Sequence, residues 1–348
     1  MIKVGILGSS GYAGAELVRL LIQHEDVEIV FVDSKDSEDV LFTDLYPNLY
    51  KHIDKKFTSL DISDNPYFDE IDLLFCALPH GLTQKAVSAA FKRGLRIIDL
   101  SADFRLSDPA VYEKWYDTAH IAKDELKEAV YGLPEIHRSD IPGTNLIANP
   151  GCYPTSIILG LYPLFKAGLA PKAPIISDSK SGVSGAGRGL RDGNLYCQAT
   201  ENISPYSVGT HRHIPEIEEQ LTKISDNPAK ILFTPHLVPM QRGILSTIYL
   251  NNEFSISEED LLKLYGETYK YEAFIRILPP GSTPKTKAVA GSNYCDIAIK
   301  VDEVTGYIVI MSAIDNLIKG ASGQALQNMN LMFGLDESKG LEQLPLWP

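Results

Sequence analysis

The sequence predicts two domains of different class: an α/β domain built on a parallel sheet, followed by an α+β domain whose sheet is mostly antiparallel. Three observations support this. The chain has 348 residues, more than one domain usually holds. In its first half, short apolar runs alternate with amphipathic stretches, which is the pattern of βαβ units. After Pro150 the apolar runs become longer, and fewer helical stretches separate them.

The parallel sheet is predicted from five short apolar runs in the first half. They are Lys3–Leu7, Glu28–Val32, Asp72–Ala77, Arg96–Asp99 and Leu146–Ala148. Amphipathic stretches between them predict helices at Ala13–His24 and Leu82–Lys92. The second helix is followed by Arg93-Gly94, a pair typical of a helix C-terminus.

The second half predicts five longer strands and three helices. The strands are Ala173–Ser179, Lys230–Pro239, Ile244–Asn251, Cys295–Val301 and Gly306–Ala313, and the helices are Thr155–Lys166, Ile256–Tyr269 and Asn316–Phe333. Because the last helix can pack back onto the first domain, we expect that domain to comprise residues 1–151 plus 316–348. The second domain would then be residues 152–315.

Composition and charge exclude several classes of protein. The net charge of −13 argues against nucleic acid or an anionic membrane surface as a partner. The cysteines Cys76, Cys152, Cys197 and Cys295 form no CxxC pair, so neither a disulfide framework nor a metal site is expected. No signal peptide and no membrane-spanning run is recognisable, and we expect a cytoplasmic protein.

A glycine-rich turn directly follows the first predicted strand and opens the first helix. It reads Gly8-Ser-Ser-Gly11-Tyr-Ala-Gly14. In this context glycines permit a tight turn and the helix N-terminus attracts a pyrophosphate, as in Rossmann-type dinucleotide-binding domains. The first domain is therefore predicted to be Rossmann-type. Its expected cofactor ligands in the turn are Gly8, Ser10, Gly11, Tyr12, Ala13 and Gly14.

The end of the second strand bears on which nicotinamide dinucleotide binds. An acidic residue at this place usually holds the ribose hydroxyls of NAD, whereas a cation accommodates the 2′-phosphate of NADP. Here Asp33 points to NAD, and Lys35 points to NADP. We expect NADP, with Ser34 and Lys35 as ligands of the 2′-phosphate.

Cys152 is the candidate nucleophile. It lies in Asn149-Pro-Gly-Cys-Tyr-Pro-Thr155, between a predicted strand and a predicted helix. A helix N-terminus favours the thiolate and can lower the pKa of a thiol well below its usual ~8.5. Such a thiolate is the group required for covalent attack on an acyl phosphate. The other three cysteines carry no comparable context, and Cys76 lies inside an apolar strand, where we expect a buried structural residue.

A second cluster of reactive residues lies in Thr210-His-Arg-His-Ile-Pro-Glu216. If the segment is extended, His211 and His213 point to the same side and Arg212 to the other. We expect His213 to act as the acid or base toward Cys152, with His211 lining the substrate pocket and Glu216 orienting either ring. The order of the two histidines stays open.

Several cations and amides can hold an anionic substrate against the negative charge of the whole chain. The glycine-rich segment from Lys180 to Arg188 offers cations at both ends and successive N–H groups that can form an anion-binding concavity. Arg105 follows the fourth strand, where guanidinium can bind phosphate bidentately. We expect Ser181 and Gly182 to contact the cofactor. The expected substrate ligands are Arg105, Asn149, Lys180, Arg188, Arg212 and Glu216.

Taken together, these motifs resemble the N-acetyl-γ-glutamyl-phosphate reductase family of the aspartate-semialdehyde dehydrogenase superfamily. The resemblance covers nearly the whole chain. The matching segments are Gly8–Leu17, Ala77–Gly81, Asp99–Leu106, Tyr131–Glu135, Asn149–Thr155, Ser181–Arg188, His211–Ile217 and Asp315–Asn330.

The resemblance implies a reductase that uses NADPH to convert N-acetyl-glutamyl 5-phosphate to N-acetyl-glutamate 5-semialdehyde through a Cys152 thioester, in arginine biosynthesis. It also implies that Asn316 lies near the nicotinamide amide, and that the chain forms homodimers or homotetramers. The alternatives are the same chemistry on N-acetyl-aminoadipyl phosphate or on aspartyl phosphate, because one methylene is worth only ~1–3 kcal/mol in a pocket. A more remote alternative is an NADP-binding sensor without activity.

Overall fold

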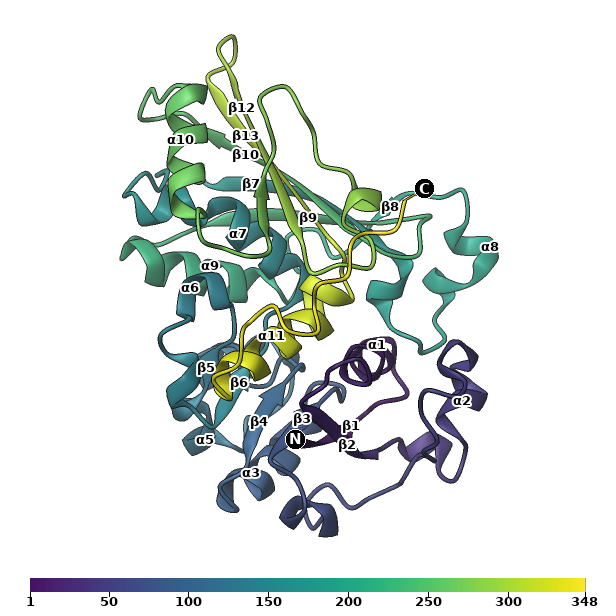
Figure 1. Cartoon of the computed structure of the whole chain (residues 1–348). Coiled ribbons are helices and arrows are strands. Elements are labelled where there is room, and N and C mark those ends of the chain that lie inside the picture. Colours follow the sequence, from purple (N-terminus) through teal and green to yellow (C-terminus); the bar gives the residue numbers. More distant parts are fainter. Residues whose placement is uncertain (348) are drawn as a thin grey trace. The chain divides into compact units, whose positions relative to one another are not determined.

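The computed structural model describes residues 1–347 and divides into two compact units (Figure 1). Unit one consists of Met1–Pro150 and Ala321–Glu342; unit two consists of Gly151–Gly320 and the C-terminal residues from Gln343. The return of the chain to unit one falls at residue 321, inside the segment predicted as the last helix. The division by function that the sequence predicts, a cofactor domain and a catalytic domain, remains a prediction.

Unit one is built on a six-stranded parallel sheet, in the order β2-β1-β3-β4-β6-β5. The strands are β1 (Ile2–Leu7), β2 (Val27–Val32), β3 (Leu73–Cys76), β4 (Arg96–Asp99), β5 (Val130–Tyr131) and β6 (Leu146–Ala148). The five predicted strands are confirmed. The sequence prediction missed β5, because a strand of two residues has no apolar periodicity to recognise.

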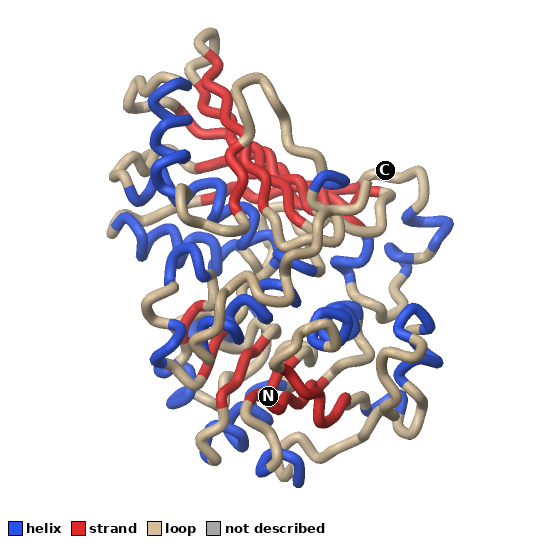
Figure 2. The backbone as a smooth tube through the Cα atoms, in the orientation of Figure 1, coloured by secondary structure: helices blue, strands red, loops and turns tan. Residues whose placement is uncertain are grey.

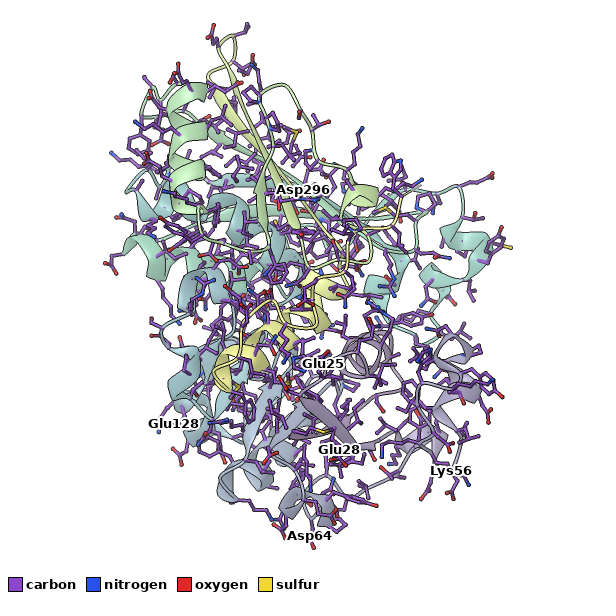
Figure 3. The ribbon with its side chains drawn as sticks, in the orientation of Figure 1. Glu25, Glu28, Lys56, Asp64, Glu128 and Asp296 are labelled. Atoms are coloured by element: carbon purple, nitrogen blue, oxygen red, sulfur yellow. The ribbon has the colours of Figure 1, made fainter. Side chains whose placement is uncertain are left out.

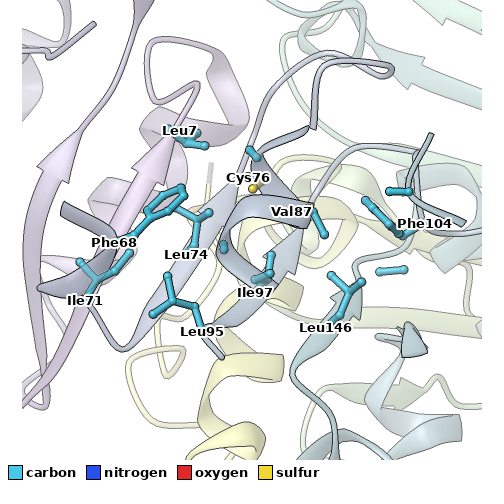
Figure 4. Packing of buried hydrophobic residues seen from close by; sticks show 14 of the residues in the cluster. Leu7, Phe68, Ile71, Leu74, Cys76, Val87, Leu95, Ile97, Phe104 and Leu146 are labelled. Atoms are coloured by element: carbon cyan, nitrogen blue, oxygen red, sulfur yellow. The ribbon is translucent and has the colours of Figure 1, made fainter. Parts of the chain in front are cut away.

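Unit one also contains α-helices, some of which contact the parallel sheet. They are α1 (Tyr12–Leu21), α2 (Phe42–Leu45), α3 (Thr83–Lys92), α4 (Pro109–Tyr116), α5 (Lys123–Glu128), α6 (Pro134–His137) and α11 (Gly323–Met332). Helix α1 packs against α11, and α3 packs against α5. The core beneath α3 is apolar and includes Leu74, Ile97 and Leu146 (Figure 4). Cys76 lies in this core, fully buried, so its predicted structural role is confirmed.

Unit two contains a seven-stranded mixed sheet, in the order β11-β12-β13-β10-β7-β9-β8 (Figure 2). Its strands are β7 (Ile175–Gly182), β8 (Ser204–Pro205), β9 (Ile231–Val238), β10 (Ile244–Asn251), β11 (Ile275–Ile277), β12 (Cys295–Asp302) and β13 (Tyr307–Ile314). Only the β7–β9 and β11–β12 pairs are parallel. The predicted mostly antiparallel sheet is confirmed, and its five long strands lie where they were expected.

The helices of unit two are α7 (Cys152–Lys166), α8 (Tyr196–Ala199), α9 (Ile214–Ser225) and α10 (Glu258–Thr268). Helix α7 packs on β10 and β13 and also contacts α9 and α10, so these three helices lie on the same face of the sheet. Short 3₁₀ turns lie at Lys35–Ser37, Pro47–Leu49, Pro66–Asp69, Ile141–Gly143, Val183–Ala186, Asp192–Asn194 and Thr286–Ala288.

A row of small hydroxyl residues fixes α7 on the sheet. Ser179, Ser246 and Ser312 are paired in register across β7, β10 and β13, and all three are fully buried. The Ser156 hydroxyl of α7 donates to Ser246 Oγ (3.0 Å) and lies 3.1 Å from Ser312 Oγ. One helical turn further, an added Cβ on Gly160 would lie 3.2 Å from Ile248 Cδ1. Small residues therefore let the helix approach the strands closely, and the hydroxyl bonds define its position.

Two tyrosines of the α10 region bind carbonyls of α7, and one of them compensates for a proline inside the helix. Pro163 has no N–H, so the Leu159 carbonyl one turn earlier lacks its helical donor. The Tyr269 hydroxyl donates to this carbonyl at 2.5 Å, and the Tyr265 hydroxyl donates to the Gly160 carbonyl at 2.6 Å. These bonds satisfy buried acceptors in the middle of α7.

The prediction of one helix over Asn316–Phe333 is wrong at its start. The chain first forms a π-helix at Ile318–Ser322, and the α-helix begins only at Gly323. Asn316 lies outside both helices and does not cap α11, whose N-cap is Ser322. The hydrophobic pattern of the segment cannot distinguish a wide helical turn from an ordinary one, because the two differ by a single residue per turn.

Charged side chains lie mostly at the surface, as the labels on Glu25, Glu28, Lys56, Asp64 and Glu128 illustrate (Figure 3). Asp296 is an exception: it is buried and forms a bidentate ion pair with Arg276 (2.5 and 2.9 Å). Within residues 1–347, no helix has the length and apolar character needed to cross a membrane.

Candidate active site

The three glycines of the first turn differ in how much space the protein leaves for a side chain. Gly8 has φ +75°, and an added Cβ would lie 2.5 Å from the Ala77 carbonyl oxygen. At Gly14 an added Cβ would lie 2.6 Å from Ser9 Cα. At Gly11, however, the nearest described atom would be the Gly8 oxygen, 3.6 Å away. Packing therefore explains Gly8 and Gly14. The open space at Gly11, which is the N-cap of α1, fits the close approach of a pyrophosphate.

Side chains around this turn tie it to β2 and α2. Ser9 donates to the Asp33 carbonyl through both its N–H and its hydroxyl (each 2.9 Å). The Ser34 hydroxyl donates to Ser10 Oγ (2.7 Å), and the Tyr46 hydroxyl donates to the Ser10 carbonyl (2.7 Å). The structure thus brings Ser10 and Ser34 together, as the sequence predicted for two cofactor ligands. Tyr46 was not predicted, and no motif marks it.

The Asp33 carboxylate is used inside the protein. Its Oδ2 accepts from the Leu60 N–H (2.9 Å), and the side chain is buried. Burial raises the pKa of this carboxyl to about 6, against the lowering effect of the Leu60 and Thr58 hydrogen bonds. Lys35, two residues on, is exposed. The acidic residue that pointed to NAD is therefore a structural anchor for the segment at residue 60.

Cys152 is the first residue of α7, and Gly151 is the N-cap. The sequence predicted the periodic part of this helix from Thr155 and placed Cys152 at or just before the helix start, where the structure has it. The Gly151 N–H donates to Glu216 Oε1 (2.8 Å), so the buried carboxylate of α9 holds the residue immediately before the candidate nucleophile. Glu216 had been expected to orient an imidazole; the structure shows it bound to backbone. Cys152 itself is partly exposed.

The His-Arg-His segment is not extended. Residues 207–213 form turns that lead into α9, and the Ile214 N–H donates to the His211 carbonyl (3.0 Å). The rings of His211 and His213 nevertheless lie together, with centroids 4.7 Å apart. The His213 N–H donates to His211 Nδ1 (3.1 Å), which places the proton of the neutral His211 ring on Nε2. Burial lowers the pKa of His211 to about 4, and the neighbouring Arg212 charge adds to the effect.

Two tyrosines that the sequence analysis missed complete this cluster. The hydroxyl groups of Tyr153 and Tyr206 lie 3.0 Å apart, and both rings pack edge-on against His211. Burial raises the pKa of Tyr206 to about 12, and the negative charge of Cys152 acts in the same direction. Tyr206 and Cys152 are therefore close enough to interact electrostatically. Tyr153 follows Cys152 directly, which was the only sequence signal for either tyrosine.

Arg105 and Asn149 both bind backbone in unit one. Arg105 donates from Nε to the Asn149 carbonyl and from Nη2 to the Leu100 carbonyl (each 2.8 Å). Asn149 Nδ2 donates to the Ala321 carbonyl (3.0 Å). These contacts hold the segment that leads to Cys152. The roles predicted for the two residues, in phosphate and oxyanion binding, remain predictions.

Two buried carboxylates follow β4. Asp103 accepts from the Gly81 N–H (2.7 and 2.9 Å), the Thr83 hydroxyl (2.7 Å) and the Tyr112 hydroxyl (2.6 Å). It thereby fixes the loop after β3 at the carboxyl end of the sheet, where ligands bind in such folds. Asp99 is also fully buried, and burial together with the charge of Asp103 raises its pKa to about 7. The sequence pattern indicated no role for either acid.

The expected anion-binding concavity of the second glycine-rich segment is not formed by its first N–H groups. Those of Gly182, Val183 and Ser184 donate to the carbonyls of residues 243, 240 and 241. Gly182 is required there, because an added Cβ would lie 2.7 Å from the Gln241 carbonyl oxygen. The N–H groups face the protein's own turn and are not available to a ligand.

The remaining predicted ligands have different surroundings in unit two. Lys180 pairs with Asp178 (2.9 Å), and alternation along β7 places both on the sheet face opposite α7. Arg188 is exposed. The hydroxyl of the buried Ser181 donates to the Gly182 carbonyl (3.0 Å). Asn316 accepts from the Gly243 N–H (2.7 Å) and donates to Ser184 Oγ (3.0 Å), so its carboxamide joins three segments of unit two.

Comparisons with known proteins agree with these features. Residues 3–144 match the family model of the semialdehyde dehydrogenase NAD-binding domain, and residues 152–316 match that of the semialdehyde dehydrogenase dimerisation domain. A protein of Alkaliphilus metalliredigens named N-acetyl-gamma-glutamyl-phosphate reductase is 56% identical over 348 residues, covering all of both chains. One of Desulforudis audaxviator with the same name is 51% identical over 348 residues, with the same full coverage.

Solved structures share the fold at low sequence identity. Aspartate semialdehyde dehydrogenase II from Vibrio cholerae has a TM-score of 0.75 at 18% identity, over 96% of this chain and 99% of that one. Aspartate semialdehyde dehydrogenase with NADP from Candida albicans has a TM-score of 0.70 at 16% identity, over 96% and 99% of the two chains.

Proposed function

We propose that this chain, which belongs to the semialdehyde dehydrogenase family and within it to the N-acetyl-γ-glutamyl-phosphate reductases, reduces N-acetyl-glutamyl 5-phosphate to N-acetyl-glutamate 5-semialdehyde and phosphate. The observation that carries the proposal is the position of Cys152 at the start of α7. The Gly151 N–H, just before it, donates to Glu216, and this bond ties the nucleophile to the segment that contains both histidines. The names of the full-length relatives supply the substrate.

The reaction uses Cys152 as a covalent nucleophile. Its thiolate Sγ bonds to the carbonyl carbon of the acyl phosphate, and the C–O bond to phosphate breaks with its electron pair, leaving a thioester. Bound NADPH supplies the hydride that reduces this thioester. The C–S bond then breaks, the aldehyde is released, and the thiolate is restored. The N–H groups at the start of α7 point out of the helix N-terminus, and they are the donors best placed to stabilise charge on the carbonyl oxygen.

His213 is proposed as the residue that takes the proton of Cys152. An acid–base group must exchange a proton near the working pH. His211, with a pKa near 4, stays neutral there. We therefore assign His211 to lining the substrate pocket. Arg105, Asn149, Arg188 and Arg212 are retained as candidate ligands of the substrate's charged groups.

NADP is proposed as the cofactor. The buried Asp33 carboxylate already accepts the Leu60 N–H, which weakens the argument for NAD. Ser34 lies against Ser10 of the glycine turn and precedes the exposed Lys35, so both residues can serve a 2′-phosphate. A higher kcat/KM with NADH than with NADPH would contradict this assignment.

A homodimer is proposed through the outer face of the unit-two sheet. Ile176, Leu232 and Tyr249 are directly paired in register on neighbouring strands, and their exposed fractions are 37%, 48% and 36%. A row of exposed apolar side chains in the centre of a sheet is typical of an interaction surface. The match of this unit to a dimerisation domain supports a second copy of the chain as the partner. A homotetramer would need a further surface.

The phosphate-dependent reverse reaction tests the function. Wild-type protein is mixed with phosphate, NADP⁺ and N-acetyl-glutamate 5-semialdehyde. Two alternative substrates are assayed separately: N-acetyl-aminoadipate semialdehyde, which is one carbon longer, and aspartate semialdehyde. We expect the first aldehyde to give the highest kcat/KM. A higher kcat/KM with one of the alternative aldehydes would identify that aldehyde as the substrate. No turnover with any of the three would favour a cofactor-binding sensor.

Replacing the nucleophile tests the mechanism. Cys152→Ala is expected to lower kcat by ~10⁴-fold or more, the order seen when a covalent nucleophile is lost. NADPH binding, measured by fluorescence titration, should stay unchanged because the glycine turn is intact. Cys197→Ala is the matched control, since Cys197 is exposed in α8. Retained activity in Cys152→Ala would refute the thioester mechanism.

A further inference from the structure

Gly320 lies directly against the candidate nucleophile. A Cβ added at Gly320 would be 2.8 Å from Cys152 Cβ and 3.2 Å from Cys152 Cα. Real Cβ atoms essentially never approach other atoms so closely. The obstacle is also not the flexible end of a side chain, which could move aside, but the root of the Cys152 side chain and its backbone. Only glycine fits at position 320 while Cys152 occupies its place.

The backbone at Gly320 has an unusual conformation that produces this approach. The Gly320 N–H donates to the Asp315 carbonyl (3.0 Å), a bond that spans five residues and belongs to the π-helix Ile318–Ser322. An α-helix would join residue 320 to residue 316 instead. Such wide turns are rare and occur frequently at functional sites. This wide turn is the stretch of backbone that lies against Cys152.

The start of the wide turn is anchored to neighbouring loops of unit two. Asp315 is fully buried; its Oδ1 accepts from the Leu317 N–H (2.9 Å), and its Oδ2 accepts from the Gly291 N–H (2.8 Å). Asn316 is bound to Gly243 and Ser184, as described above. With both residues fixed, the turn cannot retreat from Cys152 without breaking several buried hydrogen bonds.

We propose that Gly320 is a positioning residue for Cys152: its bare Cα forms a fixed wall against the Cα and Cβ of the nucleophile, so that only Sγ is free to move. The Glu216 carboxylate holds the preceding residue, Gly151, and Gly320 limits Cys152 itself. This inference deepens the proposed function and rests on it, because fixing the position of Sγ is useful only if Sγ attacks the substrate.

The experiment compares Gly320→Ala with two glycine controls in a Cys197→Ser background, where the remaining cysteines other than Cys152 are buried. Gly160→Ala is the crowded control, because its Cβ would meet Ile248 and Ile310 at 3.2 and 3.3 Å but not Cys152. Gly266→Ala is the open control, with no described atom within 4 Å of its Cβ. The readouts are kcat, KM, the rate of Cys152 alkylation by iodoacetamide, and the melting temperature.

For Gly320→Ala we expect kcat to fall ~100-fold with little change in KM, because a displacement of about 1 Å at a reacting group can cost that much. Alkylation of Cys152 should slow at least ~10-fold, as the new methyl crowds the thiol. Gly160→Ala should lower the melting temperature without either effect, and Gly266→Ala should change none of the four readouts. If Gly320→Ala behaves like Gly160→Ala, the proposal is overturned.

A double-mutant cycle keeps the test decisive even where Gly320→Ala folds poorly. Cys152→Gly removes the Cβ that the new methyl would strike. The stability lost in Gly320→Ala should therefore be largely regained in Gly320→Ala/Cys152→Gly, whereas Gly160→Ala/Cys152→Gly should show additive losses. If the stability losses of Gly320→Ala and Cys152→Gly were additive, the proposed contact between the two residues would be refuted. Alkylation and stability require no substrate, so failure of the proposed reductase activity in the wild type would be recognised separately.

Discussion

At the residue scale, neighbouring side chains of one motif differ in chemistry because their surroundings differ. His211 and His213 are two residues apart and their rings touch, yet burial together with Arg212 keeps His211 neutral. Asp33 and Lys35 likewise gave opposite indications of the cofactor until the Leu60 N–H was seen to occupy the carboxylate. Residue types can be recognised in a sequence, but their protonation depends on desolvation and partners that come from distant segments.

Asp99 makes the stability of the protein depend on pH. Its pKa is raised to about 7 in the folded chain by burial and by Asp103, whereas an unfolded chain has a value near ~3.9. Between these two values the folded state binds more protons than the unfolded state, so the free energy of unfolding decreases as pH rises from about 4 to about 7.

We therefore expect Asp99→Asn to gain stability relative to the wild type as pH rises from 5 to 8. Urea denaturation at the two pH values measures this difference, and Asp64→Asn, at an exposed position, is the control. Parallel pH dependences in Asp99→Asn and the wild type would show that Asp99 does not carry the effect.

At the element scale, α7 shows how much of a helix its own sequence predicts. The helix was recognised, and Pro154 placed Cys152 at or just before its start, although the periodic pattern itself begins only at Thr155. Its interior proline would by itself cost ~3 kcal/mol or more. The helix continues through Pro163 because a tyrosine of the α10 region supplies the missing donor, which a sequence window over α7 cannot show. The π-helix before α11 was missed for a similar reason, since the bonds that hold Asp315 and Asn316 come from other segments.

Tyr269→Phe is expected to destabilise the protein by ~1–3 kcal/mol, the usual cost of leaving a buried acceptor without a donor. Adding Pro163→Ala should recover much of the loss, because the restored N–H can bond to the Leu159 carbonyl within the helix. Chemical denaturation of the single and double variants measures the coupling. Tyr271→Phe is the control at an exposed position. Equal stability of Tyr269→Phe and wild type would mean that the Leu159 carbonyl needs no partner.

At the scale of the whole molecule, the net charge and the exposed apolar row on unit two restrict which partners the protein can bind. The charge of −13 leaves an anionic substrate dependent on local cations and N–H groups. The row formed by Ile176, Leu232 and Tyr249 offers a contact that does not depend on charge. Neither property determines the fold, but each restricts what the folded chain can bind.

Leu232→Glu is expected to weaken self-association by ~100-fold or more, because a dimer would bury an unpaired carboxylate twice. Analytical ultracentrifugation over a range of concentrations should show a smaller species than the wild type. Val304→Glu, in the exposed turn between β12 and β13, is the control. An unchanged sedimentation profile in Leu232→Glu would move the interface to another face.

The sequence by itself determined the fold class, the parallel and mixed sheets, the glycine turn and the identity of Cys152 as the candidate nucleophile. These features depend on local spacing and periodicity, which remain visible along the chain. Only the tertiary structure decided that Asp33 is an anchor, that the first N–H groups of the second glycine segment are already used, that Glu216 holds Gly151, and that Gly320 lies against Cys152. Each of these depends on contacts between residues 27 to 168 positions apart, and such contacts exist only after the chain has packed.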